Sequence, residues 1–150
     1  MHISRYEEVP VSRKVLIVDD ERLLSRTLVQ AFRENGYDTR AAASAEEAQT
    51  IIGAGDAFDL LILDNKLPGM SGLDLLENQS RALERTRIIL MTAYDTAETQ
   101  DRSRRLGVDR YLRKPFDLSA VLEMGSQLVS EAENGGEPLH SHNRSSREGG

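Results

Sequence analysis

The chain has 150 residues and a formal net charge of −6 at pH 7, and 39% of its residues are hydrophobic. A chain of this length and composition suits one globular domain with its own core. It contains no cysteine, which excludes disulfides and zinc–thiolate sites, and its acidic balance argues against direct binding to nucleic acid. No stretch approaches the roughly 20 apolar residues of a membrane helix, and the first residues lack the apolar core of a signal peptide. We therefore expect a cytoplasmic protein.

Five short apolar runs alternate with five helical patterns along the chain. The runs predict buried strands at 14–18, 59–63 and 87–91, with weaker strands at 38–42 and 110–112. Apolar residues at helical spacing predict helices at about 21–35, 44–52, 71–83 and 95–106, and from 117 onward. Strands alternating with such helices imply a doubly wound α/β fold, in which one parallel sheet carries helices on both faces.

Capping residues mark two of the helix starts. Ser44, with Glu47 three residues later, forms a capping box at the second helix. Ser71 is suited to cap the third helix. The inner face of that third helix is expected to use Leu73, Leu76 and Leu83.

The predicted helix at 95–106 has an unusually thin apolar stripe. Ala97 and Leu106 are its only apolar members. A helix that buries so little apolar area costs little to displace. Its outer side is expected to carry mixed charge, from Glu98, Asp101, Arg102, Arg104 and Arg105.

The composition divides the chain into three parts. Residues 1–13 are predicted to be a flexible lead, 14–132 the folded domain and 133–150 a disordered tail, since the last stretch lacks apolar periodicity. All histidines fall in the two predicted flexible ends, so a phosphoryl donor would have to be another molecule. These histidines are His2, His140 and His142.

Polar side chains stand directly after four of the predicted strands. Asp19 and Asp20 follow the first strand, Asp64 the third, Thr92 the fourth and Lys114 the fifth. Because parallel sheets carry their chemistry at the carboxyl ends of the strands, we expect these groups to lie together. Adjacent carboxylates repel one another unless a cation neutralises them, and Mg²⁺ prefers such oxygen ligands.

A sheet-edge carboxylate beside a metal can also act as a nucleophile. Asp64 could accept a phosphoryl group, whose oxygens Thr92 and Lys114 could then bind. Each residue alone has a simpler interpretation, as a helix-capping or turn-forming aspartate, a strand-end hydroxyl or a solvated lysine. The complete set, in this order, favours a site for a divalent cation and a phosphoryl group.

Four motifs make the chain similar to the receiver domain of bacterial two-component response regulators, over about residues 14–130. They are Val-Asp-Asp-Glu at 18–21, Leu-Asp-Asn-Lys-Leu-Pro-Gly-Met-Ser-Gly at 63–72, Met-Thr-Ala-Tyr at 91–94 and Tyr-Leu-Arg-Lys-Pro-Phe at 111–116. The resemblance implies a flavodoxin-like, five-stranded sheet of order 2-1-3-4-5. It also implies a phosphorelay component that is not an enzyme in the usual sense, although it catalyses its own phosphorylation and dephosphorylation.

The resemblance also assigns roles to the site residues. Asp64 would accept the phosphoryl group from a sensor histidine kinase or a phosphotransfer protein. Asp20, Asp64 and the backbone carbonyl of Lys66 would bind Mg²⁺, and Asp19 would act largely through water. Thr92 and Lys114 would contact the phosphoryl group, and Tyr111 would move on activation.

The same resemblance predicts a signalling face. The helix at 95–106, the strand at 110–112 and the last helix would switch together, for partner binding or for pairing of two copies. The Lys114–Pro115 peptide bond is predicted to be cis, because Lys114 must turn back from the last strand towards the site. The chain could be a stand-alone receiver or the N-terminal receiver of a longer transcription regulator.

Two rival functions use related features. An aspartate-dependent phosphohydrolase also has a nucleophilic aspartate and Mg²⁺, but such enzymes carry a second acid two residues further on, where this chain has Lys66. A receiver-like interaction module that is never phosphorylated usually has one acidic residue replaced. The complete acidic set here argues against that second alternative.

Overall fold

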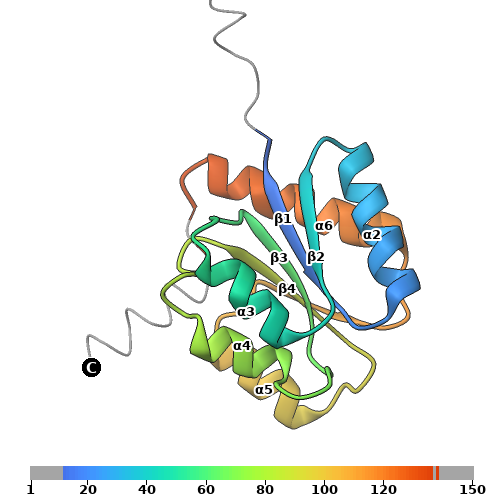
Figure 1. Ribbon diagram of the computed structural model, residues 1–150, viewed down its shortest axis with the longest axis vertical. Coiled ribbons are helices and arrows are strands. Elements are labelled where there is room, and N and C mark those ends of the chain that lie inside the picture. The colour runs from blue at the N-terminus through green and yellow to red at the C-terminus, as the bar shows by residue number, and fades with distance from the viewer. Residues whose placement is uncertain (1–11, 137, 139–150) are drawn as a thin grey trace, which may run out of the picture.

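A computed structural model describes residues 12–136 and residue 138 of the chain (Figure 1). One parallel sheet has the strand order β2-β1-β3-β4-β5, which confirms the predicted order 2-1-3-4-5. Each predicted strand is present to within one residue at either end. The strands are β1 (Lys14–Val18), β2 (Asp38–Ala42), β3 (Leu60–Asp64), β4 (Arg87–Thr92) and β5 (Arg110–Arg113).

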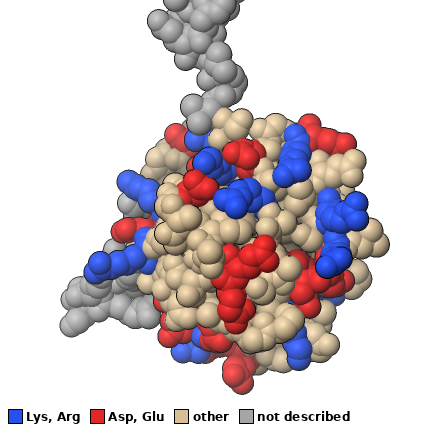
Figure 2. Space-filling model, viewed as in Figure 1, with Lys and Arg blue, Asp and Glu red and all other residues tan. Residues whose placement is uncertain are grey.

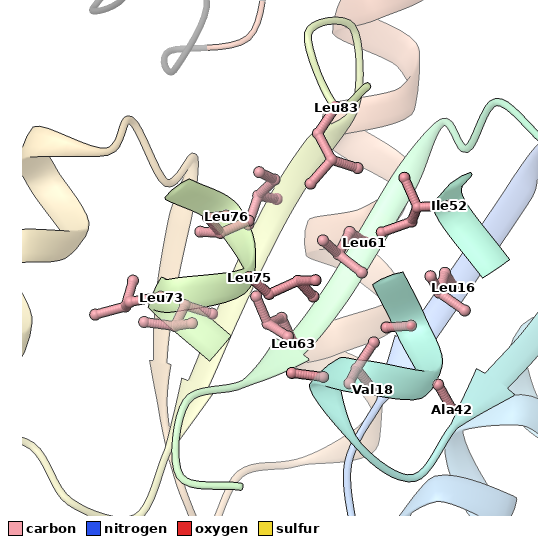
Figure 3. Close-up of a cluster of buried hydrophobic side chains, with 14 of the residues drawn as sticks. Leu16, Val18, Ala42, Ile52, Leu61, Leu63, Leu73, Leu75, Leu76 and Leu83 are labelled. Carbon is pink, nitrogen blue, oxygen red and sulfur yellow. The ribbon is translucent and has the colours of Figure 1, made fainter. Parts of the chain in front are cut away.

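Helices cover both faces of this sheet, as a doubly wound fold requires. The described helices are α2 (Arg22–Glu34), α3 (Ala45–Gly53), α4 (Gly72–Asn78), α5 (Ala97–Arg105) and α6 (Leu118–Glu133). One core lies between the sheet and α2 and α6, and a second between the sheet and α3 and α4. Alternate side chains of each strand point into the two cores, so Val15 belongs to the first and Leu16 to the second. Figure 3 shows the second core, with Leu61 and Leu63 of β3 beneath α3 and α4.

Helix α4 is shorter than the sequence pattern predicts. Ser71 and Asp74 form a reciprocal capping box at its start, but the helix ends at Asn78. The predicted inner-face residue Leu83 is buried in the turn that follows, where its N–H donates to the carbonyl of Gln79. The prediction placed Leu83 on the helix because its spacing continues the helical period, although the backbone has already turned.

Helix α5 has the thin apolar anchoring that the sequence predicts, since Ser103 is its only buried residue. The prediction that Arg102 lies on the outer side is wrong. Its Nη2 donates to Asp74 of α4 at 2.8 Å and to Glu77 at 2.9 Å. Hydrogen bonds to these two carboxylates raise the pKa of Arg102. A polar helix pattern does not reveal which of its charged residues faces an acidic neighbour, so the ion pairs are visible only in the fold.

The surface and the chain ends complete the description. Figure 2 shows acidic and basic side chains interspersed on one face of the molecule. Within residues 12–136, no helix combines the length and apolar character needed to cross a membrane. The predicted lead at 1–13 and tail at 133–150 fall mostly on residues 1–11, 137 and 139–150, which lie outside the described residues.

Gly125 sets how closely α6 approaches the sheet. A Cβ at this position would lie 2.9 Å from Leu60 Cδ2 and 3.1 Å from a ring carbon of Phe32. Replacing Gly125 with Ala should lower the free energy of unfolding by about 1–3 kcal/mol, because an added methyl overpacks a filled core. Denaturant unfolding measures this change. The matched control is Gly53→Ala, where nothing lies within 4 Å of the new methyl group. Equal stability of the two variants would contradict the packing argument.

Candidate functional site

Three carboxylates meet at the carboxyl ends of β1 and β3. Asp64 is the last residue of β3, and Asp19 and Asp20 directly follow β1. One ligand oxygen from each of the three lies within 4.8 Å of the others. Asp19 and Asp64 are buried, whereas Asp20 is exposed. The strand ends therefore gather the acidic groups as the sequence predicts, and solvent reaches the cluster at Asp20.

Lys114 joins these carboxylates from the end of β5. Its Nζ donates to Asp19 Oδ2 at 2.9 Å, to Glu21 Oε1 at 2.8 Å and to Asp64 Oδ2 at 3.1 Å. Its backbone N–H donates to the carbonyl of Thr92 at 2.9 Å, which ties β5 to β4. The peptide bond that follows Lys114 is cis, as predicted. The ammonium group supplies the one positive charge that contacts Asp64 directly among the described residues.

Burial and charge shift the pKa values of both partners. Burial raises the pKa of Asp64 to about 6, although the nearby Lys114 charge opposes the shift; the Asp19 charge adds to it. Burial alone would lower the pKa of Lys114, but the hydrogen bonds to Glu21 and Asp19 and the charge of Asp64 raise it overall. The site therefore pairs a carboxyl group whose ionisation is disfavoured by burial with an ammonium group that stays charged.

The loop after β3 is built closely around Asp64. A Cβ at Gly72 would overlap the carbonyl oxygen of Asp64, so only glycine lets α4 begin so near the strand end. Asn65 holds the turn together, because its carbonyl accepts from the Gly72 N–H and its side chain accepts from the Leu73 N–H. The Lys66 N–H donates to Asp64 Oδ1 at 3.2 Å. This loop therefore orients the carboxylate from one side, while Lys114 holds the other oxygen.

Helix α3 supports the far end of the same loop. Glu46 Oε2 accepts from the Met70 N–H at 2.9 Å, and this bond lowers the pKa of Glu46. Gly69 has a positive φ of 77°, and a Cβ there would come within 2.7 Å of the Glu46 carboxylate. The loop from 64 to 72 is thus held at both ends by specific contacts.

Thr92 and Tyr111 lie in the same region but are bound to other groups. The buried Thr92 hydroxyl accepts from the Tyr94 N–H at 2.9 Å and donates to the Tyr94 carbonyl at 3.2 Å. The Tyr111 hydroxyl donates to Asp95 Oδ1 at 2.8 Å. Burial and this bond raise the pKa of Tyr111 to about 12. Asp95 also accepts from Gln100 and Arg113, so it links the start of α5 to β5.

Sequence reasoning identified the carboxylates and the lysine but assigned no role to Glu21 or Asp95. Glu21 occupies the N-cap position of α2, where Ser, Thr, Asp or Asn is preferred, and that mismatch is a usable signal. Asp95 offers no comparable signal, since an aspartate before a polar helix is common. The role of the Lys66 carbonyl as a metal ligand stays a prediction.

The donor set fits a divalent cation. Carboxylate oxygens are the ligands that Mg²⁺ and Ca²⁺ take in proteins, and the exposed Asp20 leaves room for waters. Burial and, to a smaller extent, the like charge of Asp19 raise the pKa of Asp64 despite the nearby Lys114, so a further positive charge at the cluster would favour its ionised form. The residues present therefore suit a hard cation at this edge of the sheet.

Comparison with known proteins defines the family. A family model for the response regulator receiver domain matches residues 15–126. The chain belongs to this family, whose members are signalling phosphoacceptors of two-component systems. Sporulation initiation phosphotransferase F of Bacillus subtilis is 35% identical over 111 residues, covering 74% of this chain and 89% of that protein. The regulatory protein AtoC of Escherichia coli is 37% identical over 120 residues, covering 78% of this chain but 26% of that protein.

Solved structures agree with this assignment. A CheY-like receiver domain protein from Methanospirillum hungatei has a TM-score of 0.78 at 31% identity, covering 84% of this chain and 100% of that one. The response regulator TrrA of Thermotoga maritima, solved with Mg²⁺ and BeF, has a TM-score of 0.68 at 32% identity, covering 77% and 98%. The predicted family and fold are therefore confirmed.

The raised pKa of Asp64 makes its charge destabilising. Its folded pKa is about 6, above the unfolded value of about 3.9, so folding stability is lost as the pH rises through this interval. Asp64→Asn carries no such penalty. Without divalent ions, this variant should be more stable than wild type by on the order of 1–3 kcal/mol above about pH 7, and the gain should vanish below about pH 4.

Denaturant unfolding across this pH range, in chelator, measures the gain. Asp38→Asn is the control, because Asp38 is exposed at the start of β2. A gain that does not depend on pH, or a loss of stability at high pH, would contradict this electrostatic account.

Proposed function

We propose that Asp64 is the phosphoacceptor of this receiver domain. The observation that carries the proposal is its buried carboxylate, which lies 3.1 Å from Lys114 Nζ and within 4.8 Å of the oxygens of Asp19 and Asp20. A nucleophile toward phosphorus needs positive charge beside the transferring group. Asp19 shares the contact with Lys114, but Asp64 ends the central strand β3, between the carboxylates that follow β1 and Thr92 at the end of β4.

The transfer step follows from this geometry. A carboxylate oxygen of Asp64 attacks the phosphorus of a phosphohistidine donor, and the P–O bond forms as the P–N bond breaks. The electron pair of the broken bond stays on the imidazole nitrogen, which takes up a proton. Lys114 then binds a phosphoryl oxygen, and the Lys66 N–H keeps the carboxylate oriented. Attack of water on the same phosphorus returns free phosphate, so the domain both forms and hydrolyses its acyl phosphate.

Asp19, Asp20, Asp64 and the backbone carbonyl of Lys66 are proposed to hold Mg²⁺. When bound, the cation offsets the charge that accumulates on the phosphoryl oxygens. The relative TrrA, solved with Mg²⁺ and BeF, supports this choice of ion and of transferred group. Asp19 accepts from Lys114 at 2.9 Å and from the Glu21 N–H at 2.8 Å, whereas the corresponding contacts of Asp64 are 3.1 Å and 3.2 Å, so Asp19 is the most tightly held of the three carboxylates.

A sensor histidine kinase or a phosphotransfer protein is the proposed donor. A cavity of about 350 Å³ beside Lys114 is lined by Leu24, Ala93 and Phe116 among others. A hollow with an apolar lining beside a polar site suits a protein partner. The cytoplasmic location expected from the sequence stays a prediction.

The proposed output is a shift of α5 and Tyr111. If the Thr92 hydroxyl turned to a phosphoryl oxygen, it would leave Tyr94, and the loop that leads to α5 would lose a contact. Tyr111 would then exchange its bond to Asp95 for the space near Thr92. Such a change is a population shift between two arrangements. We also propose that two copies of the domain can pair through the face formed by α5, β5 and α6.

Two settings for this receiver are open, and the relatives include both. The chain matches most of the Bacillus phosphotransferase but about a quarter of the length of AtoC and of FleR. Residues 14–132 are proposed to act as the receiver unit in either setting.

Phosphorylation is expected on Asp64 alone. Incubation with a small phosphodonor and Mg²⁺ should add the mass of one phosphoryl group, measured on the intact protein, and Asp64→Asn should abolish the addition. The adduct should be labile in base, as acyl phosphates are. Asp38→Asn is the control, since it removes the same charge away from the site. Full labelling of the Asp64→Asn variant would refute the assignment.

Amide exchange with and without a beryllofluoride mimic tests the proposed switch. The largest change in protection should fall between residues 92 and 112, because α5 buries only Ser103 and is held mainly by polar contacts. The C-terminal half of α2 serves as the internal control, since Leu28, Ala31 and Phe32 anchor it in the core. Unchanged exchange in 92–112, with a response in that half of α2 instead, would exclude this output.

A further inference from the structure

We infer that Glu21 is a positioning residue for Lys114. Its carboxylate binds the ammonium group while the site is unphosphorylated and gives up this contact when a phosphoryl group binds Lys114. The inference rests on the proposed role of Asp64. Nothing in the known family match assigns a role to this side chain, which projects from the start of α2 towards the site. Its carboxylate lies 2.8 Å from Lys114 Nζ, the shortest of the three contacts that the ammonium makes.

The donor count of Lys114 requires that one contact be given up. An ammonium group has three N–H donors, and here each faces a different carboxylate. A phosphoryl oxygen can therefore bind Lys114 only by displacing one of Asp19, Glu21 and Asp64. The question is which of these three leaves at least cost.

Burial identifies the one that leaves. The Asp19 and Asp64 side chains are almost fully buried, so water cannot replace the ammonium group at either carboxylate when its contact with Lys114 breaks. The Glu21 side chain is 60% exposed, so water can solvate its carboxylate once the contact with Lys114 breaks. Asp19 is also held in place by the Glu21 N–H, which donates to its other oxygen at 2.8 Å.

At the start of α2, the contact between Glu21 and Lys114 takes the place of a helix-capping hydrogen bond. Glu21 is the N-cap residue of α2, yet its side chain makes no capping hydrogen bond, and no acid lies in the first turn. A capping residue normally satisfies one of the free N–H groups at a helix start. Here the carboxylate turns to Lys114 instead, so the side chain serves the site in preference to the helix.

The position of Glu21 also affects the charge at the entrance. It lines the cavity of about 350 Å³ that adjoins Lys114, so an incoming phosphoryl group meets a negative charge there. Removing this charge frees a donor on Lys114 and removes the repulsion. Both effects strengthen binding of a phosphoryl group, while the three carboxylates that suit a cation are untouched.

The test compares Glu21→Gln and Glu21→Ser with wild type in binding of beryllofluoride, titrated by NMR at saturating Mg²⁺. Both variants should bind the mimic about three- to tenfold more tightly, because a charge-assisted contact no longer has to be broken. Serine is a good N-cap, so agreement between the two variants separates the effect of charge from that of helix capping. With a small phosphodonor, the half-saturating concentration should fall while the maximal rate stays unchanged.

Glu34→Gln is the matched control. It removes the same charge from the other end of α2, about 20 Å away along the helix axis. It should leave mimic binding and Mg²⁺ affinity at the wild-type values, and the Glu21 variants should bind Mg²⁺ no more tightly than wild type. Wild-type affinity or weaker binding of the mimic in the Glu21 variants, an equal gain in Glu34→Gln, or a matching gain in Mg²⁺ affinity would each overturn the inference. Failure of the wild type to bind the mimic would instead overturn the proposed role of Asp64.

Discussion

The contact between the Lys114 ammonium and the buried carboxylates is the interaction on which the site depends. Asp19 and Asp64 are buried close together at the sheet edge, where two like charges would repel each other strongly in a medium of low polarity. Lys114 bridges them from a third strand. The strand order brings this about, because β1 and β4 lie on either side of β3 and β5 lies next to β4.

Much of this arrangement is readable from the sequence, for a physical reason. A fully buried parallel strand must be apolar on both faces, so its end is marked by the first polar residue, as Leu63 and Asp64 illustrate. Once the alternation of strands and helices is recognised, those polar residues must share one edge of the sheet. The sequence alone therefore places four groups at the same edge: Asp19, Asp20, Asp64 and Lys114.

Other features depend on how elements meet and have no such marker. The Arg102 contacts to Asp74 and Glu77 join two helices whose separation along the chain gives no hint of contact. Leu83 keeps a helical spacing after the helix has ended, because the core it fills continues beyond the last turn of α4. The sequence predicts that the Thr92 hydroxyl contacts a phosphoryl group, but it does not reveal that this buried hydroxyl also bonds to the backbone of Tyr94.

The polar attachment of α5 has a consequence for the history of such a domain. Its residues contribute little to the apolar cores, so many can be exchanged with small effect on folding. The chemistry of the sheet edge is built from different residues and need not change with them. Gene duplicates could therefore acquire new partners through α5 while the reaction stayed the same, which would insulate parallel pathways from cross-talk.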